Sequence, residues 1–305
     1  MEQYNLNPEF WSSKTVSIVG GTGSMGQAMT KELLNTDVKN IRIISRDEYK
    51  HYRMKEDFKD LDSKNRIHYI LGDMRLKHEM DKSLLNSDVV FSVGANKDVG
   101  TSEHNPDSAF ETNVLGNRNI AEVCIKHQIP IMIMVSTDKA TDPTTFYGKT
   151  KAMAEVIVMK ANLTKPAKFD CKFGVTRCGN LWASRRSVIE TFDRMYAENP
   201  ECELRITDER MTRFFISIER SARYQLKCAE LLRGDEWAAI SSLKPFVPEI
   251  YACKLMDIIK GRYPKAKYNI VGAHPNEKLY ESFGDDYRSD NPKYLKRYPE
   301  ILEYL

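Results

Sequence analysis

The stretch TVSIVGGTGSMGQAMTKELLN, residues 15 to 35, decides the fold. Its apolar run at 15–21 predicts a buried strand, and 24–35 has the spacing of an amphipathic helix. Gly20, Gly23 and Gly26 lie between them at GxxGxxG spacing. Glycine permits a tight turn and lets backbone N–H groups approach a pyrophosphate, whose charge a helix N-terminus favours. A plain strand-to-helix turn would also use such glycines, but this context favours nucleotide binding.

The same alternation of strand and helix continues through the first half of the chain. Helical patterns cover 47–61 and 109–127, and further apolar strands are expected at 41–45, 67–73, 88–94, 129–137 and 173–180. Short apolar strands that alternate with helices form right-handed βαβ units, so we expect an α/β protein with a doubly wound parallel (Rossmann) sheet. We assign 1–180, with about 215–245 packing back, to a nucleotide-binding domain. A smaller α+β lobe for the substrate would comprise 181–214 and 246–305.

Composition narrows the functional classes. The formal net charge is only +3 and no run of Lys or Arg occurs, so nucleic-acid binding is not indicated. No apolar stretch approaches the roughly 18 residues that a membrane span needs, and the first residues lack a secretory pattern. The six Cys show neither a CxxC pair nor metal-ligand spacing. We therefore expect a cytoplasmic protein without a membrane or metal partner.

The tip of the second strand bears on the choice of dinucleotide. An NAD-binding chain usually has an acid there for the ribose 2′-hydroxyl. This chain has Ser45 and Arg46, with Lys50 one helical turn later, which suits the 2′-phosphate of NADP, although Asp47 keeps NAD open. Asp73, after the third strand, could reach an adenine amino group or cap a helix.

The stretch STDKATDPTTFYGKTK, residues 136–151, follows the strand at 129–137 and so lies at the carboxyl edge of the sheet, where such folds bind ligands. Tyr147 and Lys151 are four apart on one helix and face the same way. An ammonium near a phenol lowers its pKa toward values useful for proton transfer. With Thr137 on the same substrate hydroxyl, the trio would oxidise an alcohol while a nicotinamide takes the hydride. A helix that contains YxxxK by chance is the alternative.

Asp138 and Lys139 go beyond what a simple dehydrogenase needs. Once an alcohol has become a ketone, the neighbouring C–H is acidic and a group one carbon further can leave. An extra acid and base therefore suggest a dehydratase. A surface Asp–Lys pair is the alternative.

These motifs carry a resemblance to a known family. GGTGSMG, SRDEYK, LGDMR, TNVLG, STDKA, YGKTK, CGNLWASRRSVIETF, ITDERMTRFF, PFVPE and HPNEKLYE cover most of residues 15 to 282. In this order they resemble extended short-chain dehydrogenases, and among them the inverting UDP-N-acetylglucosamine 4,6-dehydratases of the CapD-like polysaccharide biosynthesis family. STDKA followed by YGxTK is specific to that branch.

The resemblance implies a site for NADP and a site for a UDP-hexose, as well as a homo-oligomer. The expected NADP residues are Gly20, Thr22, Gly23, Ser24, Met25, Gly26, Ser45, Arg46, Lys50, Asp73, Met74, Ala95, Lys97, Tyr147 and Lys151. The expected substrate residues are Lys97, Asn180, Arg185, Ser187, Arg213 and Glu277, with the two arginines pairing the diphosphate and Asn180 donating a hydrogen bond.

The implied reaction converts UDP-N-acetylglucosamine to a UDP-4-keto-6-deoxy sugar with C5 inversion. Tyr147 takes the 4-hydroxyl proton, Lys139 removes the C5 proton, and Asp138 gives a proton to the departing 6-hydroxyl. Several positions near the sugar depart from the family pattern, such as Ser92 and Asp98 in place of histidines. A related UDP-hexose or a 5,6-alkene product therefore stays open. The alternatives are a UDP-sugar 4-epimerase and a catalytically silent NADP-binding regulator.

Overall fold

The larger part of the molecule is built on one parallel sheet. The computed structural model describes residues 4–182, 184, 187–233, 245–273, 276–284 and 287–305. In the described chain, six parallel strands lie in the order β3-β2-β1-β4-β5-β6. Their bounds are β1 (Thr15–Val19), β2 (Asn40–Ser45), β3 (Ile67–Leu71), β4 (Val89–Ser92), β5 (Ile131–Thr137) and β6 (Lys172–Cys178). The doubly wound Rossmann sheet expected from the sequence is confirmed. Its order reverses between β1 and β4, which is where such sheets bind ligands.

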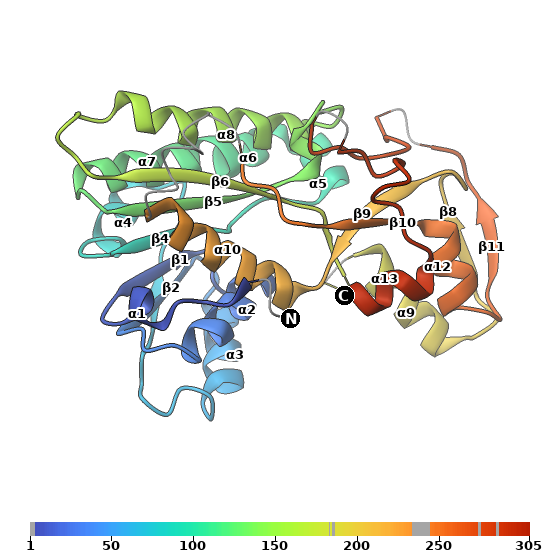
Figure 1. Ribbon diagram of the computed structural model, residues 1–305, viewed down its shortest axis with the longest axis horizontal. Helices are drawn as coiled ribbons and strands as arrows, with labels where there is room; N and C mark the ends of the chain where they lie inside the picture. The colour runs from blue at the N-terminus through green and yellow to red at the C-terminus, as the bar shows by residue number, and fades with distance from the viewer. Residues whose placement is uncertain (1–3, 183, 185–186, 234–244, 274–275, 285–286) are drawn as a thin grey trace.

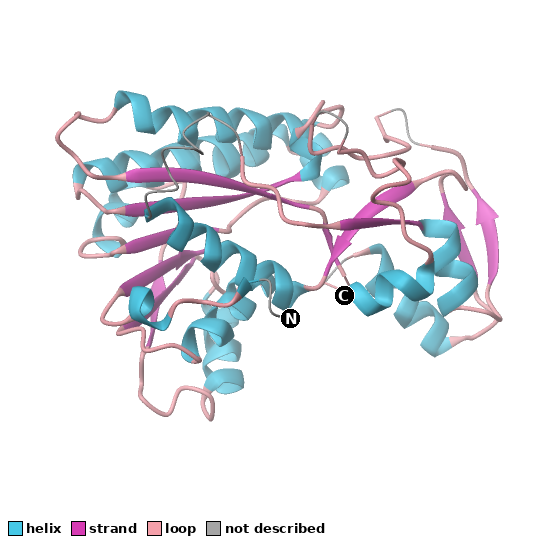
Figure 2. Cartoon of the chain, in the orientation of Figure 1, coloured by secondary structure: helices cyan, strands magenta, loops and turns pink. Residues whose placement is uncertain are grey.

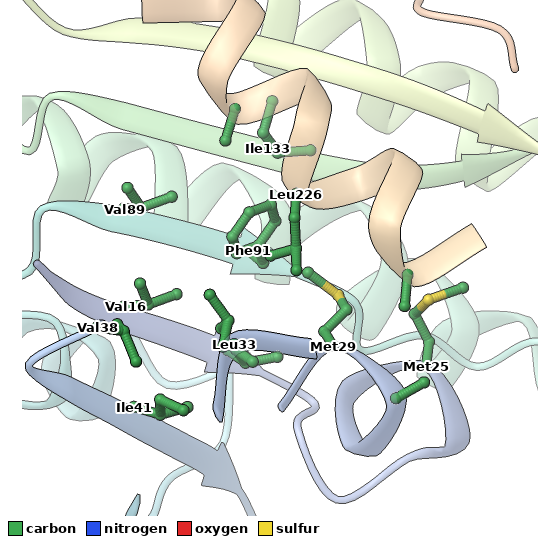
Figure 3. Close-up of a cluster of buried hydrophobic side chains, with 14 of the residues drawn as sticks. Val16, Met25, Met29, Leu33, Val38, Ile41, Val89, Phe91, Ile133 and Leu226 are labelled. Carbon is green, nitrogen blue, oxygen red and sulfur yellow. The ribbon is translucent and has the colours of Figure 1, made fainter. Parts of the chain in front are cut away.

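Helices cover both faces of this sheet (Figures 1 and 2). One face carries α1 (Pro8–Trp11), α2 (Ser24–Leu34), α3 (Glu48–Phe58) and α10 (Ile218–Arg233), whose apolar side chains pack with those of the strands. Figure 3 shows this core, where Met29 and Leu33 of α2 meet Phe91 of β4 and Leu226 of α10. The other face carries α4 (Lys77–Ser83), α7 (Gly116–Lys126) and α8 (Phe146–Thr164).

A second group of elements lies beside the carboxyl edge of the sheet, at the right of Figure 1. Strands β7 (Asn180–Leu181), β9 (Thr212–Ile216) and β10 (Tyr251–Lys254) form a small sheet, and β8 (Glu203–Ile206) pairs in parallel with β11 (Lys267–Ile270). The helices of this group are α9 (Val188–Glu198), α12 (Leu255–Arg262) and α13 (Tyr298–Tyr304). The domain boundary near residue 180 stays a prediction. In the described part of the chain, no helix is both long enough and apolar enough to span a membrane.

The helix expected at 109–127 is broken into three pieces. After α5 (Val99–His104), the chain forms α6 (Pro106–Phe110), a π-helical turn at Glu111–Leu115, and then α7. Buried amide side chains account for the turn, because Asn117 donates to the carbonyl of Asn113 at 2.7 Å and Asn113 itself donates to Thr150 at 3.0 Å. A π-turn of this kind often marks a functional region, and here it lies against α8.

Candidate active site

The glycine turn between β1 and α2 fits a dinucleotide. Gly20 has φ +83°, a left-handed conformation that favours glycine, and a Cβ on it would lie 2.4 Å from the Cα of Gly94. A Cβ on Gly26 would lie 2.4 Å from the Cα of Gly21. Gly23 caps α2 without a side chain, so the helix N-terminus directly follows the turn. The backbone therefore forms a cradle that a pyrophosphate can approach closely, and the residues present fit a nicotinamide dinucleotide.

The tip of β2 is followed by an exposed arginine, Arg46. Thr22 donates a hydrogen bond to Ser45 at 3.1 Å, which joins the glycine turn to the strand end. The side chain of Arg46 is 60% exposed. Asp47 caps α3 by accepting from the N–H of Lys50 at 3.0 Å, and it also pairs with the Lys50 ammonium at 2.9 Å. Asp47, the acid that left NAD possible as the cofactor, is therefore already paired within its own helix.

Asp73, expected at the adenine or as a helix cap, is held by arginines. Arg75 donates from Nε to both carboxylate oxygens at 3.0 and 2.9 Å, and Arg46 lies 3.7 Å away. Although burial acts in the other direction, the hydrogen bonds of Arg75 keep the pKa of Asp73 below its usual value. The alternative of a cap is wrong, because α4 has Leu76 at its N-cap. Met74, beside it, is buried.

The loop after β4 contains two more predicted cofactor residues, Ala95 and Lys97, and both are exposed. Asn113 fixes this loop from the π-helical turn. Its amide accepts from the N–H of Asn96 at 2.8 Å and donates to the carbonyl of Asn96 at 3.0 Å. The loop therefore has a fixed backbone at the carboxyl edge of the sheet, next to the end of β1. Asp98, at a departure from the family pattern, caps α5 by accepting from Thr101.

The predicted acid lies directly after β5, in a 3₁₀ turn at Asp138–Ala140. Asp138 is 0% exposed. Its Oδ1 accepts from Thr137 at 2.9 Å and from the Lys139 ammonium at 3.0 Å, whereas its Oδ2 has no hydrogen-bond partner among the described residues. Burial raises the pKa of Asp138 above its usual value, and Lys139 only partly opposes this. The carboxyl is therefore suited to hold a proton.

Lys139 is the centre of a small network of ionisable groups. Besides Asp138, its Nζ donates to Oδ1 of Asn180 at 3.1 Å and lies 3.8 Å from Oε1 of Glu281. Burial acts to lower the pKa of Lys139, but the two carboxylates outweigh it and raise that pKa. Sequence reasoning missed Glu281. The only local signal is that HPNEKLYE contains two glutamates four residues apart, and nothing in the pattern tells which one faces Lys139.

Tyr147 and Lys151 project from the first turns of α8 and are both buried. Lys151 donates to the carbonyl of Val135 at 2.7 Å. Burial raises the pKa of Tyr147 to about 12, against the opposing charge of Lys139, and burial lowers the pKa of Lys151 to about 8. The expected lowering of the tyrosine pKa by Lys151 is therefore not found, since loss of solvation outweighs the charge of Lys139, and Lys151 does not contribute.

Asn180 lies beside the predicted acid and base. Its Nδ2 donates to the carbonyl of Phe214 at 3.3 Å while its Oδ1 accepts from Lys139. The amide group is therefore engaged within the protein on both sides. The structure brings this predicted substrate residue to the Asp138–Lys139 pair.

The guanidinium of Arg213 lies 3.6 Å from the carboxylate of Glu277. The same guanidinium also makes hydrogen bonds within the protein. It donates to the carbonyls of Lys278 at 2.9 Å and Leu279 at 3.1 Å. Ser187 caps α9, where it accepts from Glu190. Arg185 lies outside the described residues.

The chain is similar in sequence to known proteins. A family model described as polysaccharide biosynthesis protein matches residues 16–302, which extends past the quoted motifs into α13. An inverting UDP-N-acetylglucosamine 4,6-dehydratase of Campylobacter jejuni is 35% identical over 272 residues, 89% of this chain and 77% of the relative. A UDP-glucose 4-epimerase of Rickettsia canadensis is 35% identical over 274 residues, 88% of this chain and 77% of that relative.

Solved structures show the same architecture. Pen from Bacillus thuringiensis superposes with a TM-score of 0.85 at 27% identity, covering 96% of this chain and 98% of that chain. DesIV, a dTDP-glucose 4,6-dehydratase of Streptomyces venezuelae with NAD and TYD bound, superposes with a TM-score of 0.71 at 16% identity, covering 87% and 86%. The second likeness shows the fold alone. The chain is therefore an enzyme of the polysaccharide biosynthesis protein family, with nucleotide-sugar 4,6-dehydratases and 4-epimerases among its relatives.

Proposed function

We propose that the protein is an NADP-dependent hydro-lyase that converts UDP-N-acetylglucosamine to UDP-4-keto-6-deoxy-N-acetylhexosamine, with inversion at C5, for the synthesis of a surface polysaccharide. The observation that carries the proposal is the buried Asp138 carboxyl, which accepts a hydrogen bond from Lys139 at one oxygen and has no partner among the described residues at the other. An acid and a base side by side are what the elimination of water needs and what a 4-epimerase does not need. Cytoplasmic location and a homo-oligomeric state stay predictions from the sequence.

NADP is the favoured dinucleotide because the tip of β2 offers an exposed guanidinium. Arg46 can meet a 2′-phosphate, while Asp47 is engaged at the N-terminus of α3. The glycine turn would hold the pyrophosphate, and Tyr147 with Lys151 would lie at the nicotinamide ribose. When bound, the nicotinamide supplies a hydride acceptor for C4 and a hydride donor for C6.

The side chains of one short segment would perform the proton transfers. The positive charge of the nicotinamide ring, when bound, would favour the phenolate form of Tyr147, and this phenolate would remove the proton of the 4-hydroxyl. The hydrogen bond of 3.0 Å between Lys139 and Asp138 lets one proton pass from the ammonium to the carboxylate. The transfer leaves a neutral acid, which burial of Asp138 favours, and a neutral amine, which burial favours but the carboxylates around Lys139 oppose. Lys139 can then remove the C5 proton, and Asp138 can protonate the departing 6-hydroxyl.

The 4-epimerase alternative keeps support from the relatives, since a UDP-glucose 4-epimerase matches this chain at the same 35% identity as the dehydratase. A 4-epimerase uses the tyrosine and the lysine of α8 but leaves C5 and the 6-hydroxyl intact. The products therefore separate the two functions. A silent NADP-binding regulator would leave every UDP-sugar unchanged.

The test is incubation of the purified protein with UDP-N-acetylglucosamine without added NADPH, followed by mass spectrometry of the nucleotide sugar. We expect a product lighter by one water. Lys139→Met should abolish this loss while NADP stays bound. Lys149→Met, which changes an exposed lysine on α8, should dehydrate as the parent does. An epimer of unchanged mass would support the 4-epimerase, and full dehydration by Lys139→Met would reject the assigned base.

A further inference from the structure

Glu281 is a buried carboxylate that the proposed mechanism does not use. It is 3% exposed, and it lies in the segment after β11 that leads to the C-terminal tail. One oxygen is 2.9 Å from the ammonium of Lys278 and the other is 3.8 Å from the ammonium of Lys139. A buried carboxylate with two ammonium groups this close is either part of a structural ion pair or part of the active site.

The segment that carries Glu281 is fixed directly onto the catalytic turn. Thr144 donates to the carbonyl of Asn276 at 2.8 Å, and Lys278 donates to the carbonyl of Thr141 at 2.9 Å. From the other side, Arg213 holds the carbonyls of residues 278 and 279. These contacts leave the segment little freedom to move relative to Asp138 and Lys139.

The backbone of Glu281 is anchored as well. Its N–H donates to Ser289 at 2.9 Å, and that buried hydroxyl is 2.7 Å from the hydroxyl of Thr212 on β9. We propose that Glu281 is a positioning residue of the active site, which holds the Lys139 ammonium beside Asp138 and sets the charge balance of this pair. The inference deepens the proposed dehydratase function and rests on it for its catalytic consequence.

The charge of Glu281 acts on both partners in the same direction. Its carboxylate acts to raise the pKa of Lys139 and the pKa of Asp138, and in each case it is the third largest influence, after burial and after the interaction between Lys139 and Asp138. Its own pKa is lowered because Lys139, Lys278 and Arg213 outweigh the effect of burial. The other ionisable groups that face the trio are Tyr147 of α8 and Cys178 of β6. Removing the negative charge should therefore make both Lys139 and Asp138 lose their protons at lower pH.

The experiment compares Glu281→Gln, Lys278→Met and the parent, with Glu209→Gln as a control at an exposed carboxylate. One readout is the pH dependence of Lys139 acetylation by acetic anhydride, followed by peptide mass spectrometry, which needs no catalysis. Glu281→Gln should lower the midpoint by about 1 unit or more, the usual effect of an opposite charge within about 4–6 Å. Lys278→Met, which removes the competing cation, should raise it.

The second readout is the pH profile of kcat for dehydration. The acidic limb reports a group that must lose its proton and the alkaline limb a group that must keep one. With Lys139 as base and Asp138 as acid, Glu281→Gln should move both limbs to lower pH, and Glu209→Gln should move neither. A purely structural ion pair would lower kcat, or the amount of folded protein, without moving either limb.

The outcomes separate the two proposals. If the parent protein dehydrates the sugar but Glu281→Gln leaves the acetylation midpoint unchanged, the role of Glu281 is rejected and the dehydratase stands. If the midpoint falls but the parent releases no water from the sugar, the charge coupling stands and the proposed function fails. Unfolding curves in urea identify a Gln variant that is misfolded, and Glu281→Asp, which keeps the charge, then replaces it and should keep the midpoint of the parent.

Discussion

Replacing Lys139 with methionine keeps most of the side-chain volume but removes the ammonium that lies 3.0 Å from Asp138 and 3.8 Å from Glu281. Two buried carboxyls then share this part of the core. Glu281 keeps Lys278 as a partner at 2.9 Å. Asp138 keeps only the hydroxyl of Thr137 among its described partners. Most of the loss of folding stability should therefore come from Asp138.

The size of the effect follows from burial. Removal of one partner of a fully buried ion pair costs about 3–5 kcal/mol. Lys139 itself is 23% exposed, so we expect a loss of about 2–3 kcal/mol at pH 8, below that range because solvent already screens the ammonium. For a chain of this size the corresponding fall in Tm is about 3–5 °C.

The effect should depend on pH in a fixed direction. Burial raises the pKa of Asp138 in the folded state, so its contribution to stability is present at low pH and is lost as pH rises through that pKa. Lys139 lowers the pKa of Glu281, which adds stability above the usual pKa of glutamate, and part of this is lost in the variant. The Asp138 contribution makes Lys139→Met more destabilising at pH 8 than at pH 5, and the Glu281 contribution is nearly the same at the two values because both lie above the usual pKa of glutamate.

The assay is urea unfolding followed by circular dichroism at both pH values, with Lys149→Met as the matched control. We expect a difference between parent and variant that grows from pH 5 to pH 8, and a control that matches the parent at both. A loss of equal size at the two pH values would refute the reasoning, because it would mean that Lys139 does not interact with the buried carboxyls.

Three further predictions concern the cofactor and the tyrosine. Gly26→Ala should lower stability by about 1–3 kcal/mol and weaken NADP binding in titration calorimetry, since its Cβ would lie 2.4 Å from the Cα of Gly21; unchanged affinity would contradict the tight turn. Arg46→Ala should weaken NADP about tenfold, roughly 1.4 kcal/mol, and leave NAD affinity nearly unchanged; equal losses for both would reject a contact with the 2′-phosphate. Tyr147→Phe should lower kcat about 10²–10⁴-fold with NADP still bound, and a smaller loss would assign the alcohol proton to another group.

The sequence predicted those features that depend on residues close together in the chain. The glycine turn, the tip of β2 and the spacing of Tyr147 and Lys151 on α8 are of this kind, because strand and helix periodicity fixes where they lie. The break at the π-helical turn was not predicted, since it depends on buried amide contacts of Asn113 and Asn117 with each other and with their neighbours.

Contacts between the two groups of elements were beyond sequence reasoning. Glu281 reaches Lys139, and Arg213 is used on backbone carbonyls, only because the segment from 276 to 281 packs on the catalytic turn. The pKa of Tyr147 was expected to fall, but its burial, which sequence periodicity does not measure, raises it to about 12.

The central claim is that Asp138 and Lys139 remove water from the sugar. It is tested most directly by NMR of the product formed from UDP-N-acetylglucosamine in D₂O. The account predicts a 4-keto-6-deoxy sugar that carries deuterium at C5, with the configuration at C5 inverted. A product with an intact 6-hydroxyl and no deuterium at C5 would contradict it.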